Sequence, residues 1–141
     1  MKIQIKKLHP DAKIPGFAQA GDVGMDMFSV EEIKIKPGQR AEIHTGVALV
    51  LPEGYAGLIW DKTGPAIGHG MKILGGVFDN NYTGEYILCL VNLGQEDYTI
   101  EKGQKVAQLL IQKVENPEVE EINELPKTNR GNGRRGSTGK F

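Results

Sequence analysis

Five short, glycine-bounded segments hold the side chains best suited to chemistry on a phosphate. They contain Asp, Lys, Thr, Gln and Arg, and they cover residues 24–27, 61–66, 76–85, 103–109 and 130–139. Singly, an Asp or Lys beside Gly at a strand end usually forms a solvated turn. The last segment is more informative, because its Gly, Ser, Thr and Arg residues supply the N–H, hydroxyl and guanidinium donors that a polyphosphate needs.

The other reactive side chains favour no different chemistry. The three histidines, His9, His44 and His69, are far apart, and none has a carboxylate at the spacing of a two-ligand motif. A protein-held zinc site is therefore not expected. The single cysteine, Cys89, lies in an apolar run and has the features of a core residue rather than a nucleophile. One cysteine cannot form an internal disulfide, which favours a cytoplasmic location.

Strands are the elements that must position these segments. Apolar residues recur at every second position in 3–5, 33–35 and 47–51, with turn residues between such runs. Strands are expected at 2–8, 30–36, 40–51, 54–60, 71–78, 84–93, 96–100 and 105–114. A short helix is expected only after Thr63. The pattern predicts one all-β domain, a sandwich, barrel or jelly roll, and no apolar run approaches the roughly 20 residues of a membrane helix.

Charge is unevenly distributed along a chain whose net charge is −1. Residues 127–141 contain basic side chains and no acid, and they follow an acidic stretch at 115–124. The body therefore lacks the basic field that attracts nucleic acid, and no nucleic-acid partner is expected. Because the glycine-rich tail cannot bury itself, we expect a body over 1–126 and an arm over 127–141 that is mobile until it meets a ligand.

Taken together and in this order, the five segments resemble the five motifs of the trimeric dUTPase family, the deoxyuridine triphosphate nucleotidohydrolases. The resemblance spans almost the whole chain. It implies a single-domain, distorted jelly roll that forms a homotrimer with a mobile C-terminal arm. It also implies three active sites at subunit interfaces, each taking motifs one, two and four from one chain, motif three from a second and motif five from a third.

The third motif carries the expected catalytic chemistry. Asp79 matches the family's water-activating carboxylate, which implies attack of water on the α-phosphorus of dUTP and release of dUMP and pyrophosphate. Tyr82 matches the ring that packs against the deoxyribose and leaves no space for a ribose hydroxyl. Segment 73–78 matches the hairpin that reads uracil through main-chain groups. The resemblance places base contacts at Ile73, Gly76, Val77 and Phe78.

Phosphate contacts are expected from two other motifs. Lys62, Thr63 and Gly64 match the family's Arg-Ser-Gly, and Gln108 matches a glutamine with the same role. Lysine in place of arginine exchanges a two-pronged donor for a point charge. Asp26 matches the aspartate that meets Mg²⁺ through water while the ion sits on the triphosphate. Mg²⁺ dehydrates reluctantly and needs few carboxylates, which agrees with the absence of a ligand cluster in the sequence.

The fifth motif is matched in part. Arg130, Ser137 and Thr138 correspond to its substrate-binding residues, but two arginines replace the usual Gly-Phe. A guanidinium plane can stack on a base, so the second of them, Arg135, is one candidate to cover the uracil. The terminal Phe141 is the other candidate.

Two alternatives to a dUTP diphosphatase remain at this point. One is a dCTP deaminase-type relative with the same fold, against which Asp79 followed by Tyr82 and the glycine-rich tail argue. The other is a nucleotide-binding regulatory trimer without turnover, given the altered residues in motifs two and five. Retention of Asp79, Tyr82, Gln108 and Arg130 argues against it.

Overall fold

Strands dominate the body of the protein, as the alternation of apolar residues predicts. The computed structural model describes residues 1–134 and 139. Its strands are β1 (Gln4–Lys7), β2 (Met25–Phe28), β3 (Ile33–Ile35), β4 (Arg40–Ile43), β5 (Val47–Val50), β6 (Tyr55–Asp61), β7 (Met71–Leu74), β8 (Val77–Phe78), β9 (Leu88–Asn92), β10 (Tyr98–Ile100) and β11 (Lys105–Lys113). Within the described residues the one helix is α1 (Thr63–His69), at the place where the sequence predicts one.

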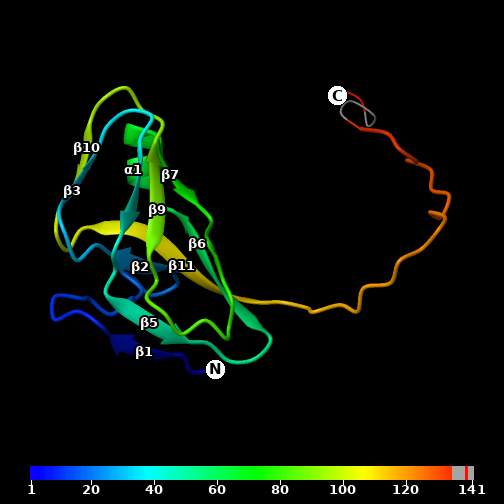
Figure 1. Ribbon diagram of the computed structural model, residues 1–141, viewed down its shortest axis with the longest axis horizontal. Helices are drawn as coiled ribbons and strands as arrows, with labels where there is room; N and C mark the ends of the chain where they lie inside the picture. The colour runs from blue at the N-terminus through cyan, green and yellow to red at the C-terminus, as the bar shows by residue number, and fades with distance from the viewer. Residues whose placement is uncertain (135–138, 140–141) are drawn as a thin grey trace.

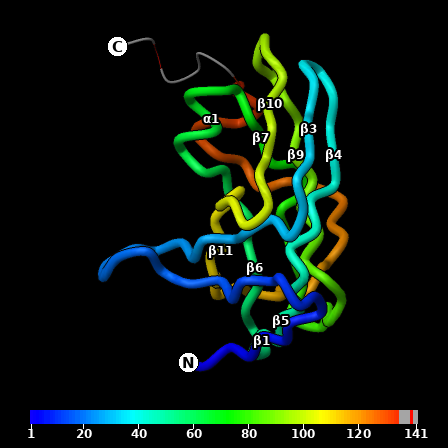
Figure 2. The backbone as a smooth tube through the Cα atoms, turned by 90° about the vertical axis from the view of Figure 1, so that its left-hand side faces the viewer, coloured from blue at the N-terminus to red at the C-terminus, as the bar shows by residue number. Residues whose placement is uncertain are grey.

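The strands pair antiparallel in small sheets that together form a distorted jelly roll (Figure 1). The largest sheet has the order β2-β11-β6-β8, and a second has the order β4-β9-β7. Two further pairs, β1-β5 and β3-β10, complete the body. In Figure 2 the β4-β9-β7 sheet and the β3-β10 pair rise together, and β1 and β5 lie at the opposite end. Strand β11 lies between β2 and β6, so it is central to the site described below.

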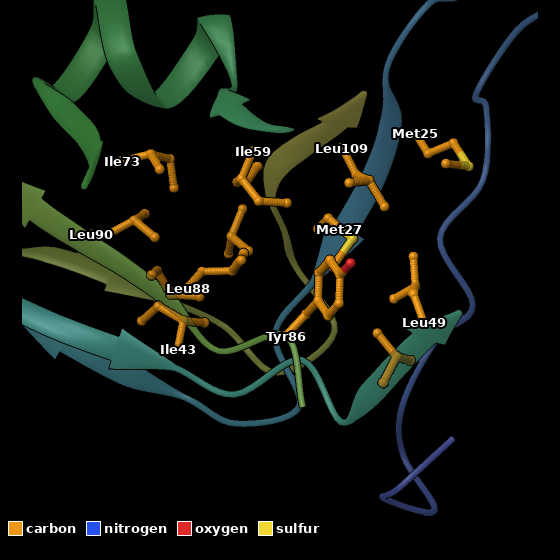
Figure 3. Packing of buried hydrophobic residues seen from close by; sticks show 14 of the residues in the cluster. Met25, Met27, Ile43, Leu49, Ile59, Ile73, Tyr86, Leu88, Leu90 and Leu109 are labelled. Atoms are coloured by element: carbon orange, nitrogen blue, oxygen red, sulfur yellow. The ribbon is translucent and has the colours of Figure 1, made fainter. Parts of the chain in front are cut away.

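The core fills the space between the two larger sheets (Figure 3). Ile59, Leu109 and Met27 of the first sheet face residues of the second, and the ring of Tyr86 lies beside them. Burial of this single apolar cluster supplies the driving force for folding. The outer face of the β11–β6 pair is therefore free to carry functional groups.

Glycines interrupt two of the expected strands. Residues 40–51 form β4 and β5 rather than one strand, because Gly46 has φ 66° and a Cβ there would lie 2.7 Å from His9 Cβ. Residues 71–78 form β7 and β8, separated at Gly75, which has φ 63°. The sequence pattern does not predict β2, because Met25, Asp26 and Met27 are all buried and so do not alternate.

An extended arm follows β11 (Figure 1). The N–H of Val114 donates to the Gly54 carbonyl, and residues 115–132 are all exposed. The hydrogen bonds described beyond Val114 join arm residues to one another, as when Gly131 N–H donates to Thr128. Irregular chain thus begins before the expected boundary at 126. In the described part of the chain no helix is long and apolar enough to cross a membrane.

Candidate active site

A hollow of about 310 Å³ on the β2-β11-β6 side collects residues from three of the five sequence segments. It is lined by Ala18, Asp22, Gly24, Asp26, Lys62, Thr63, Gly64, Pro65 and Gln108. The structure therefore brings the expected magnesium-contacting aspartate together with the expected phosphate contacts. These residues are far apart in sequence, and strand pairing unites them.

The register of β11 explains this meeting. Gln108 is paired with Asp26 on one side and with Trp60 on the other. The backbone leaves β6 at Asp61 and enters α1 directly through Lys62. The side chain of Gln108 donates from Nε2 to the Asp61 carbonyl oxygen at 3.1 Å. Gly24 keeps this region open, since a Cβ there would lie 2.7 Å from Gln108 Oε1.

Asp26 forms the floor of the hollow and is only 4% exposed. Its Oδ1 accepts a hydrogen bond from Lys62 Nζ at 2.6 Å. Its Oδ2 lies 2.6 Å from Lys105 Nζ, a close ion pair that lacks good hydrogen-bond geometry. Burial acts to raise the pKa of Asp26, but the two lysines outweigh it and lower the pKa below its usual range. The carboxylate is therefore ionised at neutral pH.

Lys105 is a member of this site that the motif resemblance does not single out. It lies in the same glycine-bounded segment as Gln108, and that shared segment is a sequence signal for it. A register shift in β11 between Lys105 and Ala107 lets both Lys105 and Gln108 approach Asp26.

The residues of the hollow fit Mg²⁺ that arrives on phosphates. Among the described residues no three His, Cys, Asp or Glu side chains are placed to hold a metal by themselves. Asp26 supplies one ionised carboxylate at the floor of the hollow, where it can face the water ligands of such an ion. A single outer carboxylate suits an ion that keeps its water ligands.

Asp79 lies elsewhere, beside a second hollow of about 190 Å³ that Asn80, Tyr55 and Asn116 help to line. Its side chain is exposed, and its carbonyl accepts the Tyr82 N–H at 3.1 Å. No hydrogen bond within the described residues occupies the Asp79 carboxylate. A carboxylate left free in this way can accept a proton from water.

Tyr82 is the exposed member of an aromatic group. Its ring centroid lies 5.8 Å from that of Phe78, which in turn stacks on Tyr86 at 4.1 Å. The Tyr82 hydroxyl donates to the Glu85 carbonyl at 2.8 Å. The tilted contact with Phe78 and the bond of the hydroxyl together orient the ring close to Asp79 in the chain.

The segment expected to form the uracil-reading hairpin packs tightly on β6, but its two strands pair with other strands, β7 with β9 and β8 with β6. The Ile59 N–H donates to the Gly76 carbonyl at 2.7 Å, and a Cβ on Gly76 would lie 2.4 Å from the Ile59 carbonyl oxygen. Val77 is 70% exposed, whereas Ile73 is buried and its N–H donates to Asp61 Oδ1 at 2.7 Å. The N–H of Ile73 is therefore committed within the chain.

Within one chain the two hollows are far apart. Strand β8 pairs Phe78 with Gly57, so Asp79 continues toward the start of β6, whereas Lys62 follows its end. About six residues along β6 separate the position beside Asp79 from Lys62, a distance of about 20 Å. One chain therefore holds the phosphate-contacting group and the Asp79 group at two separate places.

The expected residues of the arm are placed in part. Arg130 is exposed, and its Nε donates to the Gly133 carbonyl at 3.2 Å. Arg135, Ser137, Thr138 and Phe141 lie outside the described residues.

A distorted jelly roll with a buried, lysine-paired aspartate in one hollow and a free aspartate beside a second defines a β-protein built to bind an anionic ligand. Residues 10–139 match the family model described as dUTPase. The chain belongs to the dUTPase family.

Individual relatives agree with this assignment. The chain is 41% identical over 141 residues to a deoxyuridine 5'-triphosphate nucleotidohydrolase of Clostridium kluyveri, covering 99% of each protein. A dUTPase of Staphylococcus bacteriophage 80alpha, solved with dUPNHPP, superposes with a TM-score of 0.91 at 28% identity and 98% coverage of both chains. A mutant dUTPase of S. aureus phage phi11, described for its structural Mg(II) ion, gives a TM-score of 0.83 at 27% identity, covering 88% of this chain and 98% of the other.

Proposed function

We propose that this protein hydrolyses dUTP to dUMP and pyrophosphate with the help of Mg²⁺, using active sites shared between copies of the chain. The observation that carries the proposal is that the chain has two different hollows. One has cationic and amide donors over a buried aspartate, and the other lies beside a free carboxylate. The two halves supply what hydrolysis at a phosphate requires, which is charge neutralisation and a base.

The first hollow binds the triphosphate. The Lys62 ammonium moves from Asp26 to a phosphate oxygen, while Lys105 continues to neutralise Asp26. Gln108, Thr63 and Gly64 add neutral donors from the same wall. When bound, Mg²⁺ neutralises phosphate charge, and Asp26 would hold it through a water ligand.

The second group performs the chemistry. Asp79 takes a proton from the water that attacks the α-phosphorus. The ring of Tyr82 packs on the deoxyribose and excludes a ribose hydroxyl. Main-chain groups of Gly76, Val77 and Phe78 read the uracil edge, and Ile73 lines the same hollow as Gly76 and Val77 while its N–H stays bonded to Asp61.

A homotrimer joins the halves. Trp60 is 55% exposed and lies on the same face as Gln108, because the two are directly paired. Val77, 70% exposed, is paired with Leu58 and lines the same hollow as Trp60. Exposed apolar groups of this kind mark a contact surface, and here a second copy of the chain would cover them. That copy brings its Asp79 to the Lys62 hollow.

The arm completes the site as a unit distinct from the body over 1–126. Residues 127–141 extend to a neighbouring site, where Arg130, Ser137 and Thr138 bind the phosphates. Arg135 covers the base, with Phe141 as the alternative ring. We place the enzyme in the cytoplasm, where its single cysteine needs no oxidising environment.

Pyrophosphate release from dUTP, with dCTP, dTTP and UTP as controls, tests this function. We expect rapid release from dUTP alone and dependence on Mg²⁺. Deamination of dCTP would instead support a deaminase-type relative. Tight binding of dUTP without turnover would support a regulatory trimer.

A further inference from the structure

Asp61 makes hydrogen bonds to two different strands, β7 and β11. Its Oδ1 accepts the Ile73 N–H at 2.7 Å, and its Oδ2 accepts a hydrogen bond from Lys72 Nζ at 2.8 Å. Both partners belong to β7, the strand that begins the expected uracil-reading segment. The side chain of Asp61 therefore fixes the hairpin that we assign to uracil.

The main chain of Asp61 contacts the phosphate-binding hollow rather than β7. Its carbonyl accepts the Gln108 side-chain amide at 3.1 Å, and the next residue is Lys62, whose ammonium lies 2.6 Å from Asp26. Asp61 is also the last residue of β6, where the backbone turns into α1. Any shift of Asp61 toward or away from β7 therefore moves Gln108 and Lys62 as well.

We propose that Asp61 is a positioning residue that couples two neighbouring active sites, since it joins the base-reading hairpin of one site to the phosphate-binding hollow of another. This inference rests on the shared-site function proposed above. In that arrangement the hairpin of a chain serves the site containing its own Asp79, whereas its Lys62 and Gln108 serve the adjacent site. Uracil binding that orders one hairpin then orders the donors of the next site.

The first test isolates the hairpin. Asp61→Ala removes both bonds to β7, and Lys72→Met removes only the ion pair and serves as the milder variant should the first fold poorly. We expect the kcat/KM preference for dUTP over dCTP to fall at least about 5-fold in Asp61→Ala, with a smaller fall in Lys72→Met. The matched control is Asp97→Asn, which breaks the Lys34–Asp97 ion pair on the β3–β10 side and should leave the preference unchanged.

The second test isolates the hollow in mixed trimers. Wild-type chains are exchanged with an excess of Asp79→Asn chains, which either retain Asp61 or also carry the Asp61→Ala substitution. A site is active only if its Asp79, and therefore its hairpin, comes from a wild-type chain. Its Lys62 and Gln108 come mostly from the Asp79→Asn chains, because these are in excess. We expect KM for dUTP to be at least about 5-fold higher with the doubly substituted chains.

The outcomes separate the possibilities. A loss of dUTP preference in the first test together with the KM rise in the second supports coupling. An equal KM in the two mixtures would confine Asp61 to its own hairpin and overturn the proposal, as would lower thermal stability with unchanged preference and KM. Absence of dUTP turnover by the wild-type protein would instead contradict the proposed function itself.

Discussion

Asp26 places a negative charge beneath the hollow that we assign to a polyanion. Alone it would repel the phosphates, but Lys62 and Lys105 lie 2.6 Å from its two oxygens and leave the group with an excess of positive charge. Because the carboxylate is 4% exposed, water screens these interactions weakly. The arrangement holds both ammonium groups in place at Asp26 before a ligand arrives, which lowers the entropy cost of binding.

Substitution Asp79→Asn should separate catalysis from binding. The amide keeps the shape of the side chain but cannot accept the proton of water, so kcat should fall by about 10² to 10⁴. The dissociation constant for dUTP should change little, because the phosphate and base contacts remain. Pyrophosphate release and equilibrium titration measure the two quantities. Asp97→Asn is the charge-matched control. Near-normal kcat in Asp79→Asn would mean that another group accepts the proton of the attacking water.

Gly76→Ala should destabilise the protein and damage the hairpin. A Cβ would lie 2.4 Å from the Ile59 carbonyl oxygen, and the Ile59 N–H is bonded to Gly76 itself, so the two backbones cannot separate freely. We expect a loss of about 1–3 kcal/mol in urea unfolding, typical of overpacking. Gly68→Ala is the control, since a Cβ there would meet no atom within 4 Å beyond its own helix and alanine favours the helix. Equal stability of the two variants would contradict this reasoning.

At the scale of elements, the segment from Asp79 to Glu85 depends on an anchor outside it. Glu85 Oε2 lies 3.0 Å from His44 Nδ1, and Glu85 Oε1 accepts the Gly46 N–H at 2.8 Å. The hydrogen bond to Glu85 raises the pKa of His44, with burial opposing it. Burial acts to raise the pKa of Glu85, but the bonds from His44 and Gly46 lower it. Both shifts favour the charged pair.

Replacing His44 should therefore give a pH-dependent loss of stability. A raised histidine pKa contributes stability fully below 6.5, and a lowered glutamate pKa contributes it fully above 4.5. The deficit of His44→Gln should be largest between these values and fade as pH rises through the raised pKa. Since the histidine side chain is 45% exposed, we expect less than about 1 kcal/mol. Thermal unfolding at about pH 5.5, 7 and 9 measures it, and a deficit independent of pH would exclude the ion pair as its source.

Sequence periodicity predicts most strands because it records which side of a sheet is buried. It fails for β2, where Met25, Asp26 and Met27 are all buried, since the aspartate is satisfied by lysines from β11 and the β6–α1 junction. It also joins β7 to β8, because the positive φ of Gly75 leaves no mark on apolar alternation. Such features depend on contacts between segments distant in the chain.

The expected site residues divide in the same way. Motif resemblance identifies Asp26, Lys62 and Gln108, and strand register brings them together. The contacts of Asp61 with β7 could not be predicted, because an aspartate at a strand end is ordinarily a solvated turn residue. Its partners become visible only once the hairpin is folded against β6.

At the scale of the whole molecule, separation of the two hollows predicts complementation between defective chains. Chains with Asp79→Asn have an intact arm, and chains ending before Arg130 have an intact Asp79. If a site takes these parts from different subunits, an equal mixture should recover roughly a quarter of wild-type activity after random exchange. Each protein alone should stay inactive. Exchange demonstrated by native mass spectrometry without any recovery would locate the whole site in one chain.

The exposed arm also sets the effective concentration of its basic residues near the active sites. Arg130 lies sixteen positions beyond Val114, whose N–H is bonded to the body. The arginine can therefore travel at most about 55 Å and, as a coil, lies about 20–24 Å away on average. Tethering over such distances holds the basic residues at millimolar effective concentration near the sites of their own trimer. Closure is then independent of how dilute the enzyme is, provided that the trimer persists. A separate peptide of residues 127–141 would need to reach millimolar levels to replace the arm of a truncated enzyme.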